Sequence, residues 1–414
     1  TIIVTDHHEV PYKENEAGRR YILPPADAVV DPRQEGCEYP FKGLCGAAVA
    51  YKLVEALCEA NGQDVADLDY LLENVAIATV ADVMDLTEEN RILVKQGLEM
   101  LKRTSNLGLR ALIQCIGLEG KKIQAYHIGF ILAPCLNASG KLDTAKRALA
   151  LLRAKTEREA DMLAGDLKAL NESRRDMTDR VVDEAMAKVE QTDIRGDKVL
   201  VIYLPDCHES LAGLVAGRVR ENYYRPVFVL TDSEDGVKGS GRSIESYSMY
   251  EELTGCGDLL TKFGGHPMAA GLSLDKENVE KFKRRLNDQC TLSEEELTEK
   301  VVIDMELPFA AITEQFIEEL EYMEPFGKGN TKPVFAARGV VMQHVKIIGK
   351  NKNVAKATAI DAAGNRMEAI CFHDAQEFAK QCERNNGKMS ITFYPGINEF
   401  RGERQIQIVI THYR

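Results

Sequence analysis

The sequence has no tryptophan, no C-x-x-C pair and no long apolar run. Its ten cysteines are scattered, which excludes a zinc ribbon and argues against a disulfide framework, so we expect reduced thiols. No stretch approaches the roughly 18 to 20 apolar residues that would span a bilayer, and no signal peptide precedes Asp6. We therefore predict a cytoplasmic protein without a membrane partner. In the absence of tryptophan, aromatic stacking on a ligand would have to come from tyrosine, phenylalanine or histidine.

Positive charge is also in deficit. Lysine and arginine total 52 against 65 aspartates and glutamates, which gives a formal net charge of −13. This sum argues weakly against a nucleic-acid partner, although carboxylates that hold divalent metals lower the net charge of a nuclease while its binding surface stays basic. Local basic patches are more informative, and two stand out: Lys281, Lys283, Arg284 and Arg285, and then Lys346, Lys350, Lys352 and Lys356. For both patches, a solvated helix or loop face is the competing interpretation.

The length and the apolar pattern of the chain predict two or three domains. Residues 1–155 alternate short buried strands, at 1–5 and 27–32, with helices, which is typical of an α/β domain. Those helices are expected at about 43–61, 67–79, 89–103, 107–116, 123–132 and 142–153. Residues 156–192 are strongly charged, with apolar residues at helical spacing and no helix breaker. This pattern predicts one long helix that connects two domains.

The second half of the chain predicts two further folded segments. In residues 193–292 strands are expected at 198–204 and 226–230 and helices at 211–223 and 279–288, a second α/β unit. An acidic linker follows, and residues 300–414 then contain about six short alternating strands, the first expected at 301–305. Strands at this spacing favour a small closed barrel.

The first candidate site lies at the end of the opening strand, where Asp6-His7-His8 follows a buried segment. Open α/β sheets bind their ligands at such strand ends. A neutral imidazole binds Mn²⁺ or Zn²⁺, and a neighbouring carboxylate can select its tautomer. Asp82 follows an apolar helix and is a further candidate ligand, with a helix cap as the alternative interpretation.

Several segments rich in small residues are candidate anion sites. Asn137 to Lys141 and Gly239 to Ser243 are predicted as loops whose glycines admit a phosphate, with an ordinary turn as the alternative. Asp206 to Ser210 precedes a helix, and there Ser210 is the candidate cap. Gly264-Gly265-His266 combines a glycine pair, which lets the backbone approach an anion closely, with an imidazole.

These motifs occur in the order found in the DHH phosphoesterase superfamily, and the sequence most resembles the RecJ family of single-stranded-DNA-specific exonucleases within it. The motifs that carry the resemblance are Asp6-His7-His8, Gly43 to Leu53, Thr79 to Val83, Asn137 to Gly140, His208-Glu209, Gly239 to Ser243 and Gly264-Gly265-His266. Glu324 to Asn330 and Gln405 to Ile408 are similar to the oligonucleotide-binding barrel of these exonucleases, which small DHH phosphatases lack. The resemblance implies a DHH domain with a parallel sheet (1–155, first strands missing), a connecting helix (156–192), a DHHA1 α/β domain (193–292) and an OB-type β-barrel (300–414).

The resemblance also implies a role for each matched residue. His7 and Asp82 would ligate a divalent metal, Mn²⁺ or Mg²⁺, in a site that holds two ions in the family. His8 would contact the scissile phosphate and Asp6 would hold the imidazole. The implied substrate-binding residues are Asn137, Lys141, His208, Ser240, Arg242, Gly264, Gly265 and His266. The implied activity is 5′–3′ hydrolysis of single-stranded DNA in repair and recombination, with a single-strand-binding protein or a helicase as possible partners.

The sequence departs from the family pattern in three places. The family carries an Asp-x-Asp strand and a further aspartate ahead of Asp6, and these are not in this sequence, so we expect weak metal binding and little or no activity. Cys135 and Lys141 stand where the family has arginines, which lowers the expected affinity for phosphate because lysine lacks the bidentate fork. Cys207 stands where an aromatic residue is usual.

Two other functions are compatible with the same motifs. A DHH module without catalysis would bind single-stranded nucleic acid or a protein partner. A small-substrate DHH phosphodiesterase would act on oligonucleotides or cyclic dinucleotides, but the predicted barrel argues against it.

Overall fold

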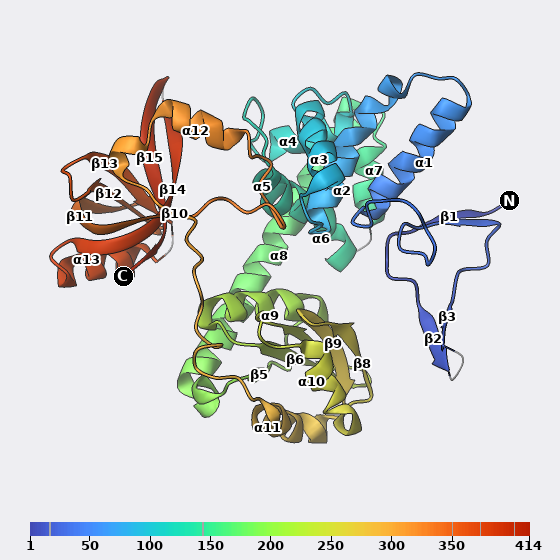
Figure 1. Cartoon of the computed structure of the whole chain (residues 1–414). Coiled ribbons are helices and arrows are strands. Elements are labelled where there is room, and N and C mark those ends of the chain that lie inside the picture. The colour runs from blue at the N-terminus through green and yellow to red at the C-terminus, as the bar shows by residue number, and fades with distance from the viewer. Residues whose placement is uncertain (16–17, 143–144, 350, 373, 401) are drawn as a thin grey trace. The chain divides into compact units, whose positions relative to one another are not determined.

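The computed structural model describes residues 1–15, 18–142, 145–349, 351–372, 374–400 and 402–414, with the backbone alone for 14, 15, 139–142 and 400. The chain divides into two compact units. Unit 1 comprises Thr1–Asn106, Leu118–Ala133 and Val301–Arg414. Unit 2 comprises Leu107–Gly117 and Pro134–Lys300. Figure 1 labels the elements of both units.

The N-terminal part of unit 1 is a short parallel strand pair followed by helices. Strand β1 (Ile3–Thr5) pairs with β4 (Ala28–Val30), and β2 (Tyr12–Asn15) forms a hairpin with β3 (Gly18–Tyr21). The helical elements are α1 (Gly46–Ala60), the 3₁₀ helix η1 (Val65–Leu71), α2 (Leu72–Ala81), α3 (Glu88–Leu101), α5 (Ala125–His127) and the π-helical turn η2 (Ile128–Leu132). Buried apolar side chains of α1, η1, α2 and α3 form one core around Leu44, Val49 and Val75. The helices at 43–61 and 89–103 therefore lie where the apolar spacing predicts them.

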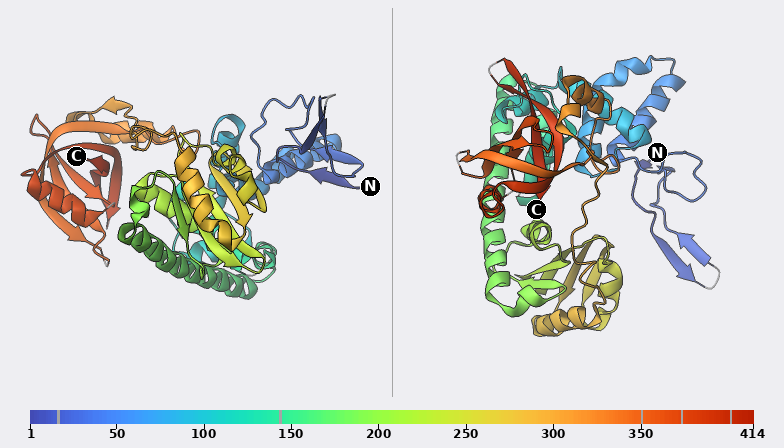
Figure 2. Two further views of the ribbon diagram at one scale, coloured as in Figure 1. Left: turned by 90° about the horizontal axis from the view of Figure 1, so that it is seen from below. Right: turned by 60° about the vertical axis from the view of Figure 1, so that its left-hand side comes forward.

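The C-terminal part of unit 1 is a closed β-barrel (Figure 2). Its strands are β10 (Met305–Glu306), β11 (Phe335–Ile348), β12 (Val354–Ile360), β13 (Arg366–Cys371), β14 (Lys388–Phe400) and β15 (Glu403–Tyr413), and its helices are η6 (Phe309–Ala311), α12 (Glu314–Glu321) and α13 (Ala375–Arg384). The sheet closes because β14 pairs with both β15 and β11. Phe309 and Phe393 fill the interior together with alternate small residues of β12. The predicted barrel is confirmed, but the strand expected at 301–305 is limited to Met305–Glu306.

Unit 2 is built on a single helix of 35 residues, α8 (Glu157–Gln191). Its first turn is capped by Thr156, whose hydroxyl accepts a hydrogen bond from the backbone N–H of Glu159 at 3.2 Å. The other helical elements are α4 (Leu107–Cys115), α6 (Ala133–Leu142), α7 (Lys146–Leu152), η3 (Asp193–Gly196), α9 (Glu209–Tyr223), α10 (Met249–Thr254), η4 (Gly257–Leu259), η5 (Lys276–Asn278) and α11 (Val279–Gln289). The long helix predicted at 156–192 is therefore present almost residue for residue.

A five-stranded sheet forms the centre of unit 2, in the order β5-β6-β7-β9-β8. The strands are β5 (Leu200–Tyr203), β6 (Val227–Ser233), β7 (Gly236–Arg242), β8 (Lys262–His266) and β9 (Ala269–Leu274), and only β5 and β6 are parallel. Alternate side chains of β6 enter different cores. Phe228 packs with Phe282 of α11, whereas Val227 and Val229 pack with α8 and α9 residues. Covering of both faces explains why β6 is a continuous apolar run.

Three segments that were predicted as anion sites, two of them as loops, belong to regular elements. Asn137 to Lys141 lies in α6, Gly239 to Arg242 in β7, and Gly264 to His266 in β8. The glycines of β7 provide space rather than flexibility. A Cβ on Gly239 would stand 2.4 Å from Leu230 Cδ2, and one on Gly241 would stand 2.7 Å from Phe228 Cε1. Side chains of the neighbouring strand occupy that space, so the error at β7 arises from packing that a local pattern does not reveal.

Among the described residues, no helix is long and apolar enough to cross a membrane. The domain boundaries predicted from the sequence stay a prediction.

We expect Gly241→Ala to destabilise unit 2 by about 1–3 kcal/mol, because the added methyl overpacks Phe228 and Met249. Urea unfolding followed by circular dichroism measures this change. Gly217→Ala in α9 is the matched control, since nothing lies within 4 Å of its added Cβ, and it should leave stability unchanged or raise it. Equal midpoints for wild type and Gly241→Ala would contradict the packing explanation.

Candidate functional site

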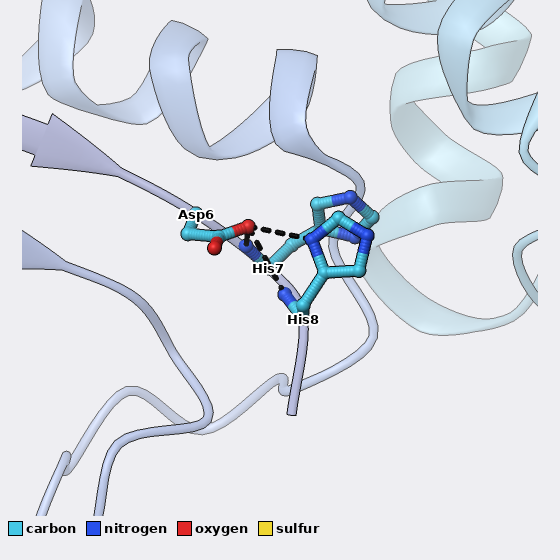
Figure 3. Close-up of side chains that lie close together, drawn as sticks. All are labelled: Asp6, His7 and His8. Atoms are coloured by element: carbon cyan, nitrogen blue, oxygen red, sulfur yellow. Dashed lines mark hydrogen bonds and ion pairs between the residues drawn. The ribbon is translucent and has the colours of Figure 1, made fainter. Parts of the chain in front are cut away.

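The Asp6-His7-His8 motif begins where the β1–β4 ladder ends. The backbone N–H of Asp6 donates to the carbonyl of Val30 at 3.0 Å, which is the last rung beside the two strands. The three side chains therefore project from the carboxyl end of a parallel pair, the position at which α/β sheets bind ligands. Figure 3 shows the three side chains together.

The Asp6 carboxylate organises this motif. Its Oδ1 accepts hydrogen bonds from the backbone N–H of His7 at 2.7 Å and of His8 at 3.3 Å, and it lies 2.7 Å from Nδ1 of the His8 ring (Figure 3). The bond to His8, followed by the backbone bond from His7, lowers the pKa of Asp6 to about 2. The same contact raises the pKa of His8 above its ordinary value. The imidazole held by Asp6 is thus that of His8, whose Nε2 stays free to meet a ligand.

His7 faces Asp82 rather than Asp6. His7 Nε2 lies 3.7 Å from Asp82 Oδ2, which is too long for a hydrogen bond. Two ligand atoms that share one Mg²⁺-sized ion, each at about 2.1 Å from it, lie about 3 to 4 Å from one another. The distance between His7 Nε2 and Asp82 Oδ2 falls in this range. The His7 ring packs against the first turn of α1, where a Cβ on Gly46 would be 3.3 Å from His7 Cδ2. Gly46 therefore leaves the space that the ring occupies.

These side chains fit a divalent cation. Asp6, His7 and His8 each place a possible ligand atom within 4.8 Å of the others, and no other such group of three occurs in the part of the chain that the structure describes. Asp82 caps the end of α2, is about half exposed and joins the group through His7. Because Oδ1 of Asp6 is engaged with His8, the other Asp6 oxygen is the one available to an ion. A mixed imidazole and carboxylate donor set suits Mn²⁺.

Asp31 also lies near this site, although it was not predicted as a site residue. Asp31 follows β4, is 5% exposed, and its negative charge contributes to the raised pKa of His8. Its Oδ1 accepts the backbone N–H of Arg33 at 2.9 Å. An acidic residue directly after the neighbouring parallel strand was the available signal, because parallel strands end at the same edge of the sheet.

A second candidate site lies on one face of the sheet in unit 2. Strand register places Ser240 beside Gly271 and Gly271 beside Gly264. Two positions further along β7, Arg242 pairs with Ala269 of β9, which pairs with His266 of β8. Two positions in the other direction, Lys238 pairs with Ser273, which pairs with Lys262. Side chains two residues apart point to the same face. Four basic side chains therefore surround a floor that is almost free of side chains.

A cavity of about 570 Å³ opens on this face, with Glu209, Lys238, Ser240, Lys262 and Gly264 among its lining residues. Lys238 Nζ is 2.7 Å from Glu209 Oε2, whereas Lys262 is exposed. The cavity brings Ser240 and Gly264 together, but its lining does not include the predicted residues Arg242, His208, Gly265 and His266.

Arg242 and Ser240 lie against the glycine side of α9. A Cβ on Gly213 would be 2.8 Å from Arg242 Nη2 and 2.9 Å from Ser240 Oγ. Arg242 Nη1 donates to Ser240 Oγ at 3.3 Å, and burial together with the charge of Arg220 lowers the pKa of Arg242. A partly desolvated guanidinium gains more from an anion than one in water does.

His208 caps α9, which corrects the prediction that Ser210 does so. His208 Nδ1 accepts the backbone N–H of Ser210 at 3.2 Å and lies 2.8 Å from Ser210 Oγ. A nitrogen of an exposed imidazole substitutes here for the usual hydroxyl or carboxylate oxygen. The cap engages Nδ1, so only Nε2 of His208 is left for a substrate.

The remaining predicted substrate residues lie in α6. Asn137 is exposed, and the side chain of Lys141 lies outside the described residues. Cys135 is buried in α6, where its sulfur accepts from Asn171 Nδ2 at 3.5 Å and burial raises its pKa to about 11. Burial likewise raises the pKa of Cys207 to about 11. Both cysteines are packing residues and contribute no charge to a phosphate site.

The two basic patches differ in how far they are neutralised. In α11, Arg285 lies 3.2 Å from Asp258, and Lys283 lies 3.8 Å from Asp193, which favours the solvated-face interpretation. In the barrel, Lys356 pairs with Glu368 at 2.8 Å, while Lys346 and Lys352 are exposed. Lys350 lies outside the described residues.

Comparison with known proteins identifies the family. Residues 303–412 match the RecJ OB domain and residues 196–292 match the DHHA1 domain. The chain is 36% identical over 414 residues to the single-stranded-DNA-specific exonuclease RecJ of Bacillus subtilis, covering 99% of this chain and 50% of that protein. It is 33% identical over 431 residues to RecJ of Salmonella typhimurium, covering 99% of this chain and 72% of that protein. The chain belongs to the RecJ family.

A solved RecJ structure supports the same assignment. RecJ from Thermus thermophilus in complex with Mn²⁺ superposes with a TM-score of 0.80 at 27% identity, over 100% of this chain and 58% of that one. The predicted resemblance and fold class are therefore confirmed, including the DHHA1 unit and the OB-type barrel. The chain spans half the length of the RecJ from Bacillus subtilis.

In metal-free protein, we expect Asp6→Asn to lower the pKa of His8 toward the ordinary histidine value. Loss of the carboxylate removes the bond that favours the protonated ring, so His8 would lose its proton at a lower pH. NMR titration of the imidazole nitrogens measures this shift. His127, whose pKa burial lowers, is the internal control and should not respond. An unchanged His8 titration in Asp6→Asn would contradict the assigned pairing.

Proposed function

We propose that the chain is the nuclease part of a divalent-metal-dependent 5′–3′ exonuclease that degrades single-stranded DNA. The observation that carries the proposal is the grouping of Asp6, His7 and His8 at a strand end with Asp82 facing His7, within a chain that aligns with most of the Salmonella typhimurium RecJ. Mn²⁺ or Mg²⁺ is the proposed cofactor, supported by the donor set and by the Mn²⁺ complex of the Thermus thermophilus RecJ.

Each residue of the first site has a separate role in this proposal. His7 and Asp82 would hold the ion, with the free oxygen of Asp6 as a further ligand. A bound ion would supply a hydroxide nucleophile and would neutralise charge that develops at phosphorus. His8 would donate from Nε2 to the scissile phosphate. Asp6 orients the His8 ring and raises its pKa, and a protonated ring donates the stronger hydrogen bond.

The basic face of unit 2 would bind phosphate groups of the strand. Gly264 and Gly271 leave the floor open to a sugar–phosphate backbone, and Lys238, Lys262 and Arg242 supply positive charge around it. A site that binds the 5′-terminal phosphate would set the polarity of hydrolysis and release mononucleotides. Lys346 and Lys352 of the barrel would follow the incoming strand electrostatically.

The proposal includes a cytoplasmic location and partners among repair proteins, such as a single-strand-binding protein or a helicase. The match of residues 303–412 to the RecJ OB domain disfavours a small-substrate phosphodiesterase. The low activity expected from a shortage of carboxylate ligands stays a prediction. A strand-binding module without catalysis is the alternative that the following assay distinguishes.

We expect His7→Ala and Asp82→Asn each to reduce Mn²⁺-dependent degradation of 5′-phosphorylated single-stranded DNA by at least about 100-fold. The assay uses the protein that contains these 414 residues and follows release of mononucleotides. Asp69→Asn, an exposed carboxylate on η1, is the matched control and should retain the wild-type rate. Strand binding without any degradation by the wild type would support the binding module and overturn the proposal.

We expect Lys262→Ala to weaken binding of single-stranded DNA and to reduce the slope of log K against log salt by about 0.7, the value for one released counterion. Fluorescence anisotropy at several salt concentrations measures that slope. Lys276→Ala is the control, because Lys276 already pairs with Asp232 at 2.9 Å. Identical slopes for Lys262→Ala and wild type would exclude the basic face from the binding path.

A further inference from the structure

The loop that carries Asp82 is strained. Val83, the next residue, has φ 55° and its side chain is exposed. A β-branched residue rarely adopts the left-handed region, because its side chain crowds the backbone there. Such a conformation persists only where the surroundings enforce it. Two backbone bonds at the end of α2 enforce it, because the N–H of Val83 donates to the carbonyl of Val80 at 3.2 Å and that of Met84 to the carbonyl of Thr79 at 3.1 Å. The residues that follow, Asp85 and Leu86, are held by contacts from other segments.

One restraint comes from the helices beneath the loop. Asn90 of α3 is fully buried, and its Nδ2 donates to the carbonyls of Gly43 at 2.8 Å and Asp85 at 3.0 Å. Gly43 lies just ahead of Gly46, the residue against which the His7 ring packs. One side chain thus joins the loop of Asp82 to the segment beside His7.

A second restraint comes from residues 321–330, which we call the clasp. The backbone N–H of Leu86 donates to the carbonyl of Lys328 at 2.7 Å, and Lys328 Nζ lies 3.0 Å from Asp85 Oδ1. Two clasp glycines press against the same loop. A Cβ on Gly327 would be 2.6 Å from Leu86 Cδ1, and one on Gly329 would be 3.0 Å from Asp85 Cβ.

The clasp is itself closed and anchored. Asn330 Nδ2 donates to the carbonyls of Met323 at 2.8 Å and Pro325 at 2.9 Å. Lys122 lies 2.8 Å from Glu321 and 3.2 Å from Glu324. Gln124 Nε2 donates to Glu324 Oε1 at 2.8 Å. These bonds fasten the clasp to the segment before α5, so it can act as a fixed support.

We propose that the clasp is a positioning element for the metal site, which holds the strained loop so that Asp82 faces His7. The clasp connects α12 to β11, so a segment of the OB-type barrel would support the candidate metal site. The part of this inference that concerns metal rests on the proposed function. The support of the loop by the clasp does not.

Hydrogen–deuterium exchange of the Leu86 amide, without metal, tests the support directly. We expect Gly327→Ala to speed this exchange by at least about tenfold, because the added methyl displaces Leu86 from the clasp. Gly396→Ala is the matched control, since its Cβ meets nothing within 4 Å and its φ is not positive. Exchange that is the same in Gly327→Ala and wild type overturns the proposal.

Gly329→Ala provides a second variant in case Gly327→Ala does not fold. Its control is Gly364→Ala, which carries a similar positive φ, 87° against 74°, but meets no neighbouring atom. Both substitutions add similar backbone strain, so the contacts with Asp85 and Thr87 distinguish them. Faster exchange in Gly329→Ala alone supports the clasp, and equal exchange in the two variants contradicts it.

Mn²⁺ affinity, measured by electron paramagnetic resonance without DNA, tests the consequence for the site. We expect Gly327→Ala to raise the Mn²⁺ dissociation constant by about tenfold, as loss of an outer supporting contact does at other metal sites. In an Asp82→Asn background the same substitution should have almost no further effect, because the two changes act through one carboxylate. An equal effect in both backgrounds overturns the positioning role. If the wild type binds no Mn²⁺, the proposed metal site fails, while the exchange experiment still decides the clasp.

Discussion

The three hydrogen bonds accepted by one oxygen of Asp6 order the candidate active site. The partners are the backbone N–H groups of His7 and His8 and the ring of His8. A single carboxylate therefore stabilises the turn after β1 and orients the imidazole of His8. The low pKa of Asp6, about 2, keeps this acceptor charged at any physiological pH. His7 is left to face Asp82, and His8 is left with one free nitrogen. The different contacts of the two histidines therefore follow from this one set of bonds.

Glycine has a comparable organising role in unit 2, through the side chain that it lacks. Gly239 and Gly241 admit Leu230 and Phe228 on the core side of the sheet, whereas Gly264 and Gly271 leave the opposite face bare. A residue with a Cβ would either overpack the core or fill the candidate binding floor. The basic side chains around the floor belong to β7 and β8, and β9 lies between these two strands. The antiparallel register places them at matching positions along the sheet.

Much of the fold was predictable because it depends on local patterns. Thr156 with the charged, breaker-free segment after it indicated α8, and the alternation of Ala355, Ala357 and Ala359 is that of a barrel strand with one buried face. The loops predicted at Asn137 and Gly239 were wrong because small residues were interpreted as flexible. In the structure the segment at Asn137 belongs to α6, and Gly239 and Gly241 of β7 lie against Leu230 and Phe228. Asp31 and Asn90 were missed, since their importance comes from neighbours that are distant in sequence.

The amino-acid sequence by itself determined the family, the order of the motifs, the long helix and the choice of Asp6, His7, His8 and Asp82, because each depends on residue type and short-range spacing. Only the tertiary structure decided which imidazole Asp6 holds, that Gly46 makes room for His7, and that residues 321–330 support the loop of Asp82. The contacts of Gly46 and of residues 321–330 join segments tens to hundreds of residues apart, whereas the Asp6–His8 bond spans two residues and depends on the turn after β1. Packing and strand register bring such segments together, and neither can be derived from a local pattern.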